Sequence, residues 1–223
     1  MSKGRLFVAP LDGSGARRLT TGGPIHFPTW LPPDGDEILF RLEGPEPAIM
    51  AIRPDGTGLR TLSTTPPNNR FDYQGISASP DGRLIGFTRW SAGGFPRVYL
   101  LDIATGKERV LPTQGNASQR GTLAFSPDGS LVAYAGVFRA GHWQVVVAPT
   151  DGSEPGHVVG PEWPTTEGNV NGTWGFTPDG TGLLVRDGDD ASSQYHLLGL
   201  DDGSDTTLGS GDFGFIDIQR LAP

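Results

Sequence analysis

The stretch Ser79-Pro80-Asp81-Gly82-Arg83-Leu84-Ile85-Gly86-Phe87 decides the fold of this 223-residue chain. Proline presets a φ of about −65° at the second position of a β-turn, and aspartate tolerates the third position. Glycine then supplies a left-handed residue that lets the chain rejoin an antiparallel partner. After the turn, Ile85 and Phe87 are two residues apart and therefore share one face of a strand. The stretch predicts a tight hairpin with one buried strand face.

The same turn recurs along the whole chain at a nearly constant interval. Four Pro-Asp-Gly turns have glycines 47, 47 and 51 residues apart, and a second set of glycine turns alternates strictly with them. The glycines of the two sets are Gly35, Gly82, Gly129 and Gly180, and Gly13, Gly56, Gly106, Gly152 and Gly203. Regular self-similarity at this period indicates repeated structural units rather than disorder, despite 34 glycines and 20 prolines.

Each repeat has room for four short strands, which we name A to D. Strand A precedes the Pro-Asp-Gly turn, strand B follows it, and strands C and D flank the second glycine turn. Strand B carries apolar residues three and five positions past its turn glycine, on one face: Ile38 and Phe40, Ile85 and Phe87, Val132 and Tyr134, Leu183 and Val185. Four antiparallel strands per repeat predict an all-β fold, a β-propeller of four-stranded blades. A two-sheet sandwich is the competing architecture, but its strands would not repeat turn chemistry every fourth strand.

The repeat boundaries predict a single domain over residues 1–223 with five blades. Four complete blades are expected at 28–63, 75–112, 121–160 and 172–209, and a closing blade at 5–20 plus 213–223. The 22 residues from Gly13 to Gly35, counted again from Gly203, place the next Pro-Asp-Gly proline at Pro223. Residues 215–221 would then be strand A of a closing blade that lacks strand B. We expect a monomer if this ring closes, and self-association if the chain is a piece of a larger propeller.

The repeat resembles a known family. Ser-Pro-Asp-Gly, an apolar strand ending in an aromatic residue, and Val98-Tyr99-Leu100-Leu101-Asp102 followed by Gly106, Arg109 and Leu111 are similar to the TolB-like propeller repeats of bacteria. The resemblance covers almost the whole chain and implies the propeller fold. It implies no single function, because such repeats occur in Tol-system components, in propellers attached to peptidases and in sensor proteins. It makes an extracytoplasmic location one expectation for the parent protein, while Met1–Pro10 holds no apolar signal-peptide stretch.

Composition excludes several classes of function. The formal net charge is −8, and the 17 Lys and Arg residues are scattered, so we expect no nucleic-acid partner. We expect no membrane insertion, because no window approaches the length and hydrophobicity of a membrane span. The chain has no cysteine, which excludes disulfides, zinc ribbons, cysteine nucleophiles and iron–sulfur ligation.

The two ends of the predicted strands differ in loop chemistry. The A–B and C–D turns emerge on one side and are short and glycine-rich, whereas the longer, varied B–C and D–A connections emerge on the other, where function usually resides. Aromatic rings there would suit stacking on a sugar or gripping a peptide. The alternative is that such aromatics only seal gaps between neighbouring blades. The predicted binding residues are Arg70, Asp72, Tyr73, Arg89, Trp90, Arg139, His142, Trp143, Trp163 and Arg186.

Four arginines follow strand B at similar offsets: Arg41, Arg89, Arg139 and Arg186. Guanidinium groups at equivalent places in successive blades could bind an anion or an acidic partner. The alternative is that they are solvated strand ends.

We expect no metal and no cofactor. The run Asp187-Gly188-Asp189-Asp190 offers oxygen ligands but lacks the twelve-residue calcium-loop pattern. The spaced glycines of 209–214 resemble a dinucleotide motif, but no helix follows to bind a phosphate. The four histidines, His26, His142, His157 and His196, lack metal-site spacing.

These features favour a non-enzymatic binding scaffold that engages a protein or peptide through the long-loop side. A carbohydrate- or small-ligand-binding propeller using the loop aromatics is the second hypothesis. The third is a hydrolase or lyase, or the propeller part of a larger hydrolase or sensor protein, although no catalytic constellation is recognisable in the sequence.

Overall fold

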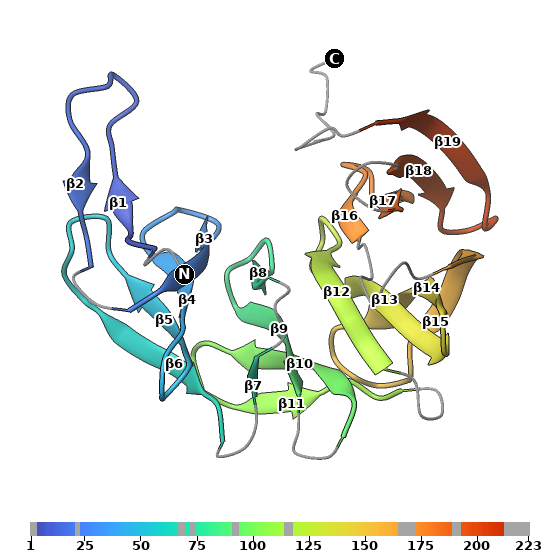
Figure 1. Ribbon diagram of the computed structural model, residues 1–223, viewed down its shortest axis with the longest axis horizontal. Coiled ribbons are helices and arrows are strands. Elements are labelled where there is room, and N and C mark those ends of the chain that lie inside the picture. The colour runs from blue at the N-terminus through green and yellow to red at the C-terminus, as the bar shows by residue number, and fades with distance from the viewer. Residues whose placement is uncertain are drawn as a thin grey trace.

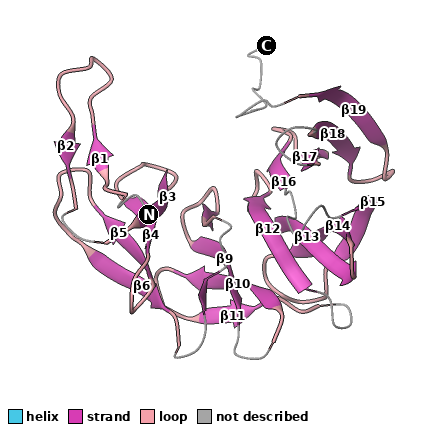
Figure 2. Ribbon diagram, in the orientation of Figure 1, coloured by secondary structure: helices cyan, strands magenta, loops and turns pink. Residues whose placement is uncertain are grey.

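The structure is a computed structural model that describes residues 4–20, 23–66, 70–71, 75–90, 94–113, 118–164, 173–188 and 193–211. Its regular elements are all strands, and Figure 2 shows strands and loops without a helix among the described residues. A two-stranded hairpin and four larger antiparallel sheets follow one another along an arc (Figure 1). The described residues contain no helix that is long and apolar enough to cross a membrane.

Each sheet is a meander of neighbouring strands. The N-terminal hairpin consists of β1 (Phe7–Val8) and β2 (Arg17–Arg18). Blade 1 consists of β3 (Ile25–Trp30), β4 (Ile38–Leu42), β5 (Ala48–Ile52) and β6 (Arg60–Thr64). Blade 2 consists of β7 (Arg70–Phe71), β8 (Ser77–Ala78), β9 (Leu84–Trp90), β10 (Pro96–Asp102) and β11 (Glu108–Val110). Blade 3 consists of β12 (Ser118–Phe125), β13 (Leu131–Arg139), β14 (His142–Pro149) and β15 (His157–Pro164). Blade 4 consists of β16 (Thr173–Phe176), β17 (Gly182–Asp187), β18 (Gln194–Gly199) and β19 (Asp205–Ser210).

The strand order confirms the predicted antiparallel A-B-C-D blade. In blades 1, 3 and 4 the hydrogen-bonded order is the order along the chain. Blade 2 differs because strand A is divided into β7 and β8, which both pair with β9. In Figure 1 the A strands β3, β8, β12 and β16 lie toward the inside of the arc, and the D strands β6, β11, β15 and β19 lie outside.

The Pro-Asp-Gly turns have the backbone that the sequence predicted. Gly82 has a φ of 69°, and its N–H donates to the Ser79 carbonyl at 2.9 Å. The Ser79 hydroxyl donates to Asp81 at 2.6 Å and accepts the Leu84 N–H at 2.9 Å. The serine and aspartate side chains thus satisfy the polar groups of the turn that begins strand B. Ser126 and Asp128 repeat this arrangement in blade 3.

Apolar cores lie between consecutive blades rather than inside any one blade. Between blades 1 and 2, Leu39, Ile49 and Ala51 pack with Ile85, Phe87 and Leu101. Between blades 3 and 4 the core is larger and includes both Trp143 and Trp163. A blade is one sheet thick, so it buries its faces only against its neighbours.

The N-terminal hairpin covers the outer face of blade 1 only in part. Leu6 of the hairpin is buried with Ile25, Ile38, Phe40 and Ile52 of blade 1, and Leu19 is partly buried beside them. The predicted C-terminal part of the closing blade, residues 213–223 with its strand at 215–221, lies outside the described residues. The described strands form no closed sheet, so the number of blades in a complete ring is not fixed by them.

Candidate functional site

We call the ends of the strands that carry the B–C and D–A connections the loop face. The described residues among the predicted binding residues reach it from three blades. Arg89 and Trp90 end β9, Arg139 ends β13, His142 and Trp143 begin β14, Trp163 lies near the end of β15, and Arg186 lies near the end of β17. Arg70 lies in β7, opposite Trp90 in the register, whereas Asp72 and Tyr73 lie outside the described residues.

The four arginines after strand B each have a partner within their own blade. Arg41 pairs with Glu43 at 2.6 Å, and the Nε of Arg186 donates to the Ser193 hydroxyl at 2.8 Å. The remaining two pairs are Arg89–Glu108 at 2.8 Å and Arg139–Glu162 at 2.7 Å. An anion at these places would have to displace an internal partner, so the geometry gives no support to a ring of available guanidinium groups.

Arg89 is a structural ion-pair residue at the junction of blades 1 and 2. Only 8% of its side chain is exposed, and its guanidinium lies 4.0 Å from the centre of the Tyr99 ring. Its partner Glu108 also accepts a hydrogen bond from Ser63 of blade 1. Charge-assisted hydrogen bonds of this kind hold two strands in one orientation. The predicted binding residue Arg89 therefore contributes, through Glu108, to the contact between blades 1 and 2.

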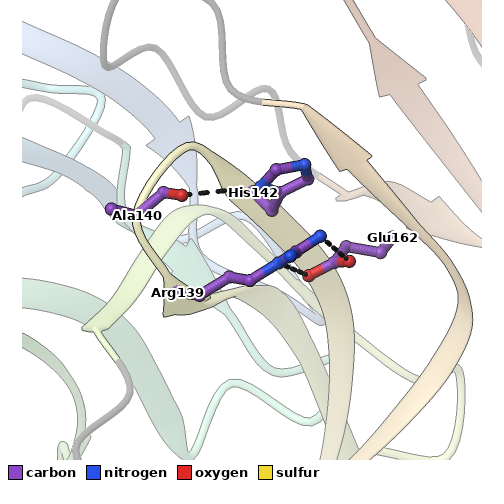
Figure 3. A network of polar contacts seen from close by, with 4 residues as sticks. All are labelled: Arg139, Ala140, His142 and Glu162. Atoms are coloured by element: carbon purple, nitrogen blue, oxygen red, sulfur yellow. Dashed lines mark hydrogen bonds and ion pairs between the residues drawn. The ribbon is translucent and has the colours of Figure 1, made fainter.

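Arg139, His142 and Glu162 form a polar cluster on the loop face of blade 3 (Figure 3). Arg139 donates through Nε and Nη2 to the two carboxylate oxygens of Glu162 at 2.9 and 2.7 Å. His142 lies beside this pair, with Nδ1 3.5 Å from the Ala140 carbonyl oxygen. The hydrogen bond from Arg139 lowers the pKa of the Glu162 carboxyl. Because 62% of the Arg139 side chain is exposed, this cluster is accessible to a partner.

Trp143 and Trp163 are buried, with exposed fractions of 1% and 6%. Their rings stack with centres 4.9 Å apart, and Trp163 also packs on His196 of blade 4 at 5.5 Å. The Nδ1 of His196 lies 2.8 Å from Asp205. Both tryptophans thus seal the junction of blades 3 and 4. This arrangement agrees with the alternative in which the aromatic residues only close gaps between neighbouring blades. As placed, they present no ring face on which a sugar could stack.

Three phenylalanines that were not among the predicted binding residues are exposed: Phe95 and Phe138 lie beside the B–C connections of their blades, and Phe27 lies within β3, strand A of blade 1. Phe27 of blade 1, Phe95 of blade 2 and Phe138 of blade 3 are 40%, 54% and 39% exposed. Large apolar side chains that remain open to water are typical of contact surfaces when they gather on one face. Phe138 lies beyond the buried alternation of strand B, and this position is the signal in the sequence that could have identified it.

Phe27 is also the one described non-glycine residue with a positive φ, 53°. It lies where the register of β3 with β4 shifts, and the Arg41 guanidinium lies 5.1 Å from the centre of its ring. A left-handed conformation costs a residue with a Cβ about 1–2 kcal/mol. The surrounding contacts therefore hold this exposed ring in a conformation that the isolated chain would avoid.

An apolar groove of about 590 Å³ opens between the N-terminal hairpin and blade 1. Ile25, Phe40, Leu42 and Met50 line it from blade 1, and Leu19 lines it from the hairpin. The B–C loop of blade 1 adds two carboxylates to its lining, Glu43 and Glu46. We call this cavity the blade 1 groove.

The acidic run at the end of β17 does not assemble a metal site among the described residues. Asp187 is half-buried, and burial raises the pKa of its carboxyl, while a hydrogen bond from Trp143 acts in the opposite direction. Asp189 and Asp190 lie outside the described residues. No group of three or more His, Asp or Glu side chains in the described ranges is placed to hold a metal ion.

Comparison with solved structures shows the fold. TolB from Acinetobacter baumannii is 20% identical to this chain, with a TM-score of 0.65 over 92% of it. An oligogalacturonate lyase in complex with manganese is 21% identical, with a TM-score of 0.66 over 89%. A puromycin hydrolase is 19% identical, with a TM-score of 0.67 over 93%. These likenesses support a TolB-like propeller fold, while no protein-family model matches the sequence.

The chain spans only part of each of these proteins. It covers 49% of the TolB chain, 54% of the lyase and 33% of the puromycin hydrolase. At this level of identity the likeness extends to the arrangement of the strands and not to the chemistry of a site.

Proposed function

We propose that this chain is a non-enzymatic binding propeller that engages a protein or peptide through its loop face. The observation that supports the proposal is the set of exposed phenylalanines in three consecutive blades, Phe27, Phe95 and Phe138. Protein interfaces combine aromatic anchors with a polar rim. On blade 3, Arg139 directly follows Phe138, and its accessible ion pair with Glu162 supplies polar groups of that kind.

A peptide suits this surface better than a sugar does. Sugar recognition relies on flat rings together with many converging hydrogen-bonding groups. The two tryptophans nearest the loop face of blade 3 are buried, and the arginines of the predicted ring are engaged within their own blades. The exposed phenylalanines offer apolar area without a polar group, which a peptide side chain can cover.

The alternative is that the chain is the propeller part of a larger hydrolase or sensor protein. The coverage supports this alternative, because the chain spans only 33% of the puromycin hydrolase and 54% of the oligogalacturonate lyase. Turnover of a generic ester, peptide or glycan substrate by residues 1–223 would support it and would contradict the non-enzymatic proposal.

The proposal is tested by selecting peptides from a random 12-residue library on the folded chain and measuring their affinities by calorimetry. Combined Phe95→Lys and Phe138→Lys substitutions should weaken the selected peptides at least tenfold. Val110→Lys is the matched control, because Val110 is 48% exposed in β11, a D strand on the outside of the arc. A glycan array is run in parallel. Glycan binding without peptide binding, or peptide binding that ignores both phenylalanines, would overturn the proposal.

We also propose that the ring has five blades, with residues 5–20 and 213–223 both contributing to the fifth. The N-terminal hairpin supports this, because β1 and β2 lie over blade 1 as strands C and D of a preceding blade would. Light scattering of residues 1–223 should show a monomer. A dimer or larger species without monomer would favour closure by self-association instead.

A further inference from the structure

Strand A shifts its register against strand B in three blades, at nearly the same distance from the turn glycine. In blade 1 the shift lies between His26 and Thr29 of β3, and in blade 3 it lies between Arg120 and Ala124 of β12. Strand β16 of blade 4 has a similar shift. The extra residues at such a shift form a β-bulge, in which one residue often takes a left-handed conformation.

Blades 1 and 3 place different residues at this bulge. Eight positions before the turn glycine, blade 3 has Gly121 with a φ of 89°, whereas blade 1 has Phe27 with a φ of 53°. Glycine adopts a left-handed backbone without steric cost, and phenylalanine does not. Pro28 adds a further restriction, because the residue before a proline favours an extended conformation. A glycine would therefore suit the backbone at position 27 better than phenylalanine does.

What phenylalanine offers at this place is an aromatic ring that remains open to water. Phe27 is 40% exposed, and the Arg41 guanidinium lies 5.1 Å from the centre of its ring. Arg41 is buried and already has an ion pair with Glu43, so its charge has a partner besides the ring. Strained residues that the surrounding structure holds in place cluster at ligand contacts and active sites.

Gly75 of blade 2 leaves room beside this ring. A Cβ at position 75 would lie 3.4 Å from Cδ1 of Phe27, in ordinary van der Waals contact. The backbone of Gly75 is not left-handed, so this position could carry a side chain without strain. A larger side chain there would lie against the Phe27 ring and cover part of it. The glycine therefore keeps the ring accessible at the junction of blades 1 and 2.

We propose that Phe27 is an aromatic anchor on which a bound peptide stacks a Phe, Tyr or Trp side chain. This inference rests on the proposed peptide-binding function and names the residue class that the peptide carries. A cationic side chain is disfavoured, because the Arg41 guanidinium already lies over the ring and would repel a second cation. A peptide ring instead gains both apolar burial and the favourable geometry of an aromatic pair.

The random peptide library that tests the proposed function also tests this contact. Peptides selected on the folded chain should share an aromatic residue at one aligned position. In the tightest peptide, cyclohexylalanine at that position keeps the volume but removes the π-electrons. This replacement should weaken binding about fivefold, and lysine there should weaken it more.

Substitutions at two glycines locate the contact without changing the Phe27 ring itself. Gly75→Val should weaken the selected peptides at least tenfold, because the new side chain covers the ring, and the melting temperature should not fall. Gly209→Val is the matched control. Gly209 lies in β19, its backbone is not left-handed, and a Cβ there would meet nothing within 4 Å. This control should leave the affinity unchanged.

Substitutions of Phe27 complete the test. Phe27→Tyr keeps an aromatic ring and should keep the affinity. Phe27→Asn should lose it at least tenfold, although asparagine tolerates the left-handed backbone. If Phe27 only packs the junction of the blades, Phe27→Asn lowers the melting temperature and Gly75→Val leaves the affinity unchanged, which would overturn the inference.

Three other results would also contradict the inference. They are selected peptides without a shared aromatic residue, equal binding of the cyclohexylalanine peptide, and equal losses of affinity from Gly75→Val and Gly209→Val. If the selected peptides still depend on Phe95 and Phe138 in these cases, the proposed function stands and only the contact at Phe27 is wrong. If no library peptide binds the chain, the proposed function fails and this inference fails with it.

Discussion

The junction of blades 3 and 4 and the outer face of blade 1 are the same kind of surface in two states of completion. The first buries ten hydrophobic side chains, including the stacked Trp143 and Trp163. The second buries five, of which only Leu6 comes from the neighbouring hairpin, and it leaves the blade 1 groove open. Among the described residues, the junction of blades 3 and 4 is therefore covered by more of its neighbour than the outer face of blade 1 is.

The largest expected difference between the two surfaces comes from truncating one apolar side chain on each. Trp143→Ala should lower the free energy of unfolding by about 3–5 kcal/mol, because it removes a fully buried ring and leaves a cavity. Met50→Ala in the half-open groove should cost about 1 kcal/mol, because its side chain is only partly buried. Urea unfolding of both variants measures the difference. Equal losses would mean that the groove is filled in solution.

Two turn glycines extend the comparison to the backbone. A Cβ on Gly82 would lie 2.0 Å from the Pro32 carbonyl oxygen of blade 1, whereas one on Gly13 in the hairpin turn would meet nothing within 4 Å. Both glycines have positive φ, 69° and 77°. Gly13→Ala should therefore cost only about 1–2 kcal/mol of backbone strain. Gly82→Ala should cost about 3 kcal/mol, because blades 1 and 2 must also move apart. Equal losses of stability in the two variants would show that the Gly82 turn of blade 2 does not pack against Pro32 of blade 1 in solution.

The repeat made most of the fold predictable, because each turn glycine fixes a backbone conformation locally. The φ values of Gly82, Gly129 and Gly180, 69°, 72° and 75°, confirm the turn that Pro-Asp-Gly predicted. The division of strand A of blade 2 into β7 and β8 was not predicted, because neither of the two repeated sets of turn glycines marks an interruption there. The incomplete cover of blade 1 was expected from the count of strands, but the open groove depends on side-chain packing that a repeat count does not contain.

The site was harder to predict than the fold because one aromatic residue type serves two purposes. Tryptophan is a residue type that binding surfaces favour, yet Trp143 and Trp163 are buried between blades. Phe95 and Phe138 are exposed, although phenylalanine is usually a core residue. Only the three-dimensional position of each strand end separates the two groups. The arginines after strand B show the same difficulty, since their carboxylate partners come from the B–C loop or strand D of the same blade.

Acid should weaken the turns of the completed blades more than the hairpin turn. Hydrogen bonds from Ser126 and from Thr177 lower the pKa of Asp128 and of Asp179 from 3.8 to about 2. A carboxyl whose pKa is lower in the folded state stabilises the fold above its unfolded pKa, and this contribution is lost as the pH falls toward the folded pKa. Melting temperatures should fall between about pH 4 and pH 2.

With Asp128→Asn and Asp179→Asn combined, the melting temperature should fall less steeply between about pH 4 and pH 2. We call this part of its pH dependence the acid limb. Asp12→Asn is the control in the hairpin, where hydrogen bonds from Ser14 also lower the pKa of the carboxyl. It should change the acid limb less, because the hairpin turn does not lie between two packed blades. An equal flattening by Asp12→Asn would show that the hairpin melts together with the complete blades.

The smallest expected effect on stability belongs to the Arg139–Glu162 pair, at the loop-face edge of the completed junction. The pair is bidentate, yet 62% of the Arg139 side chain and 33% of the Glu162 side chain are exposed. Water and salt screen such a pair, so a double-mutant cycle of Arg139→Gln and Glu162→Gln should give a coupling of less than about 1 kcal/mol.

Because Arg139 lowers the pKa of Glu162, this coupling should be present at neutral pH and vanish as Glu162 is protonated in acid. Added salt should reduce it as well. If the same substitutions weaken the peptides selected on the loop face tenfold, the pair contributes to recognition rather than to stability. A coupling of several kcal/mol would instead place these residues within the packed junction beside Trp163, and would remove them from the binding surface.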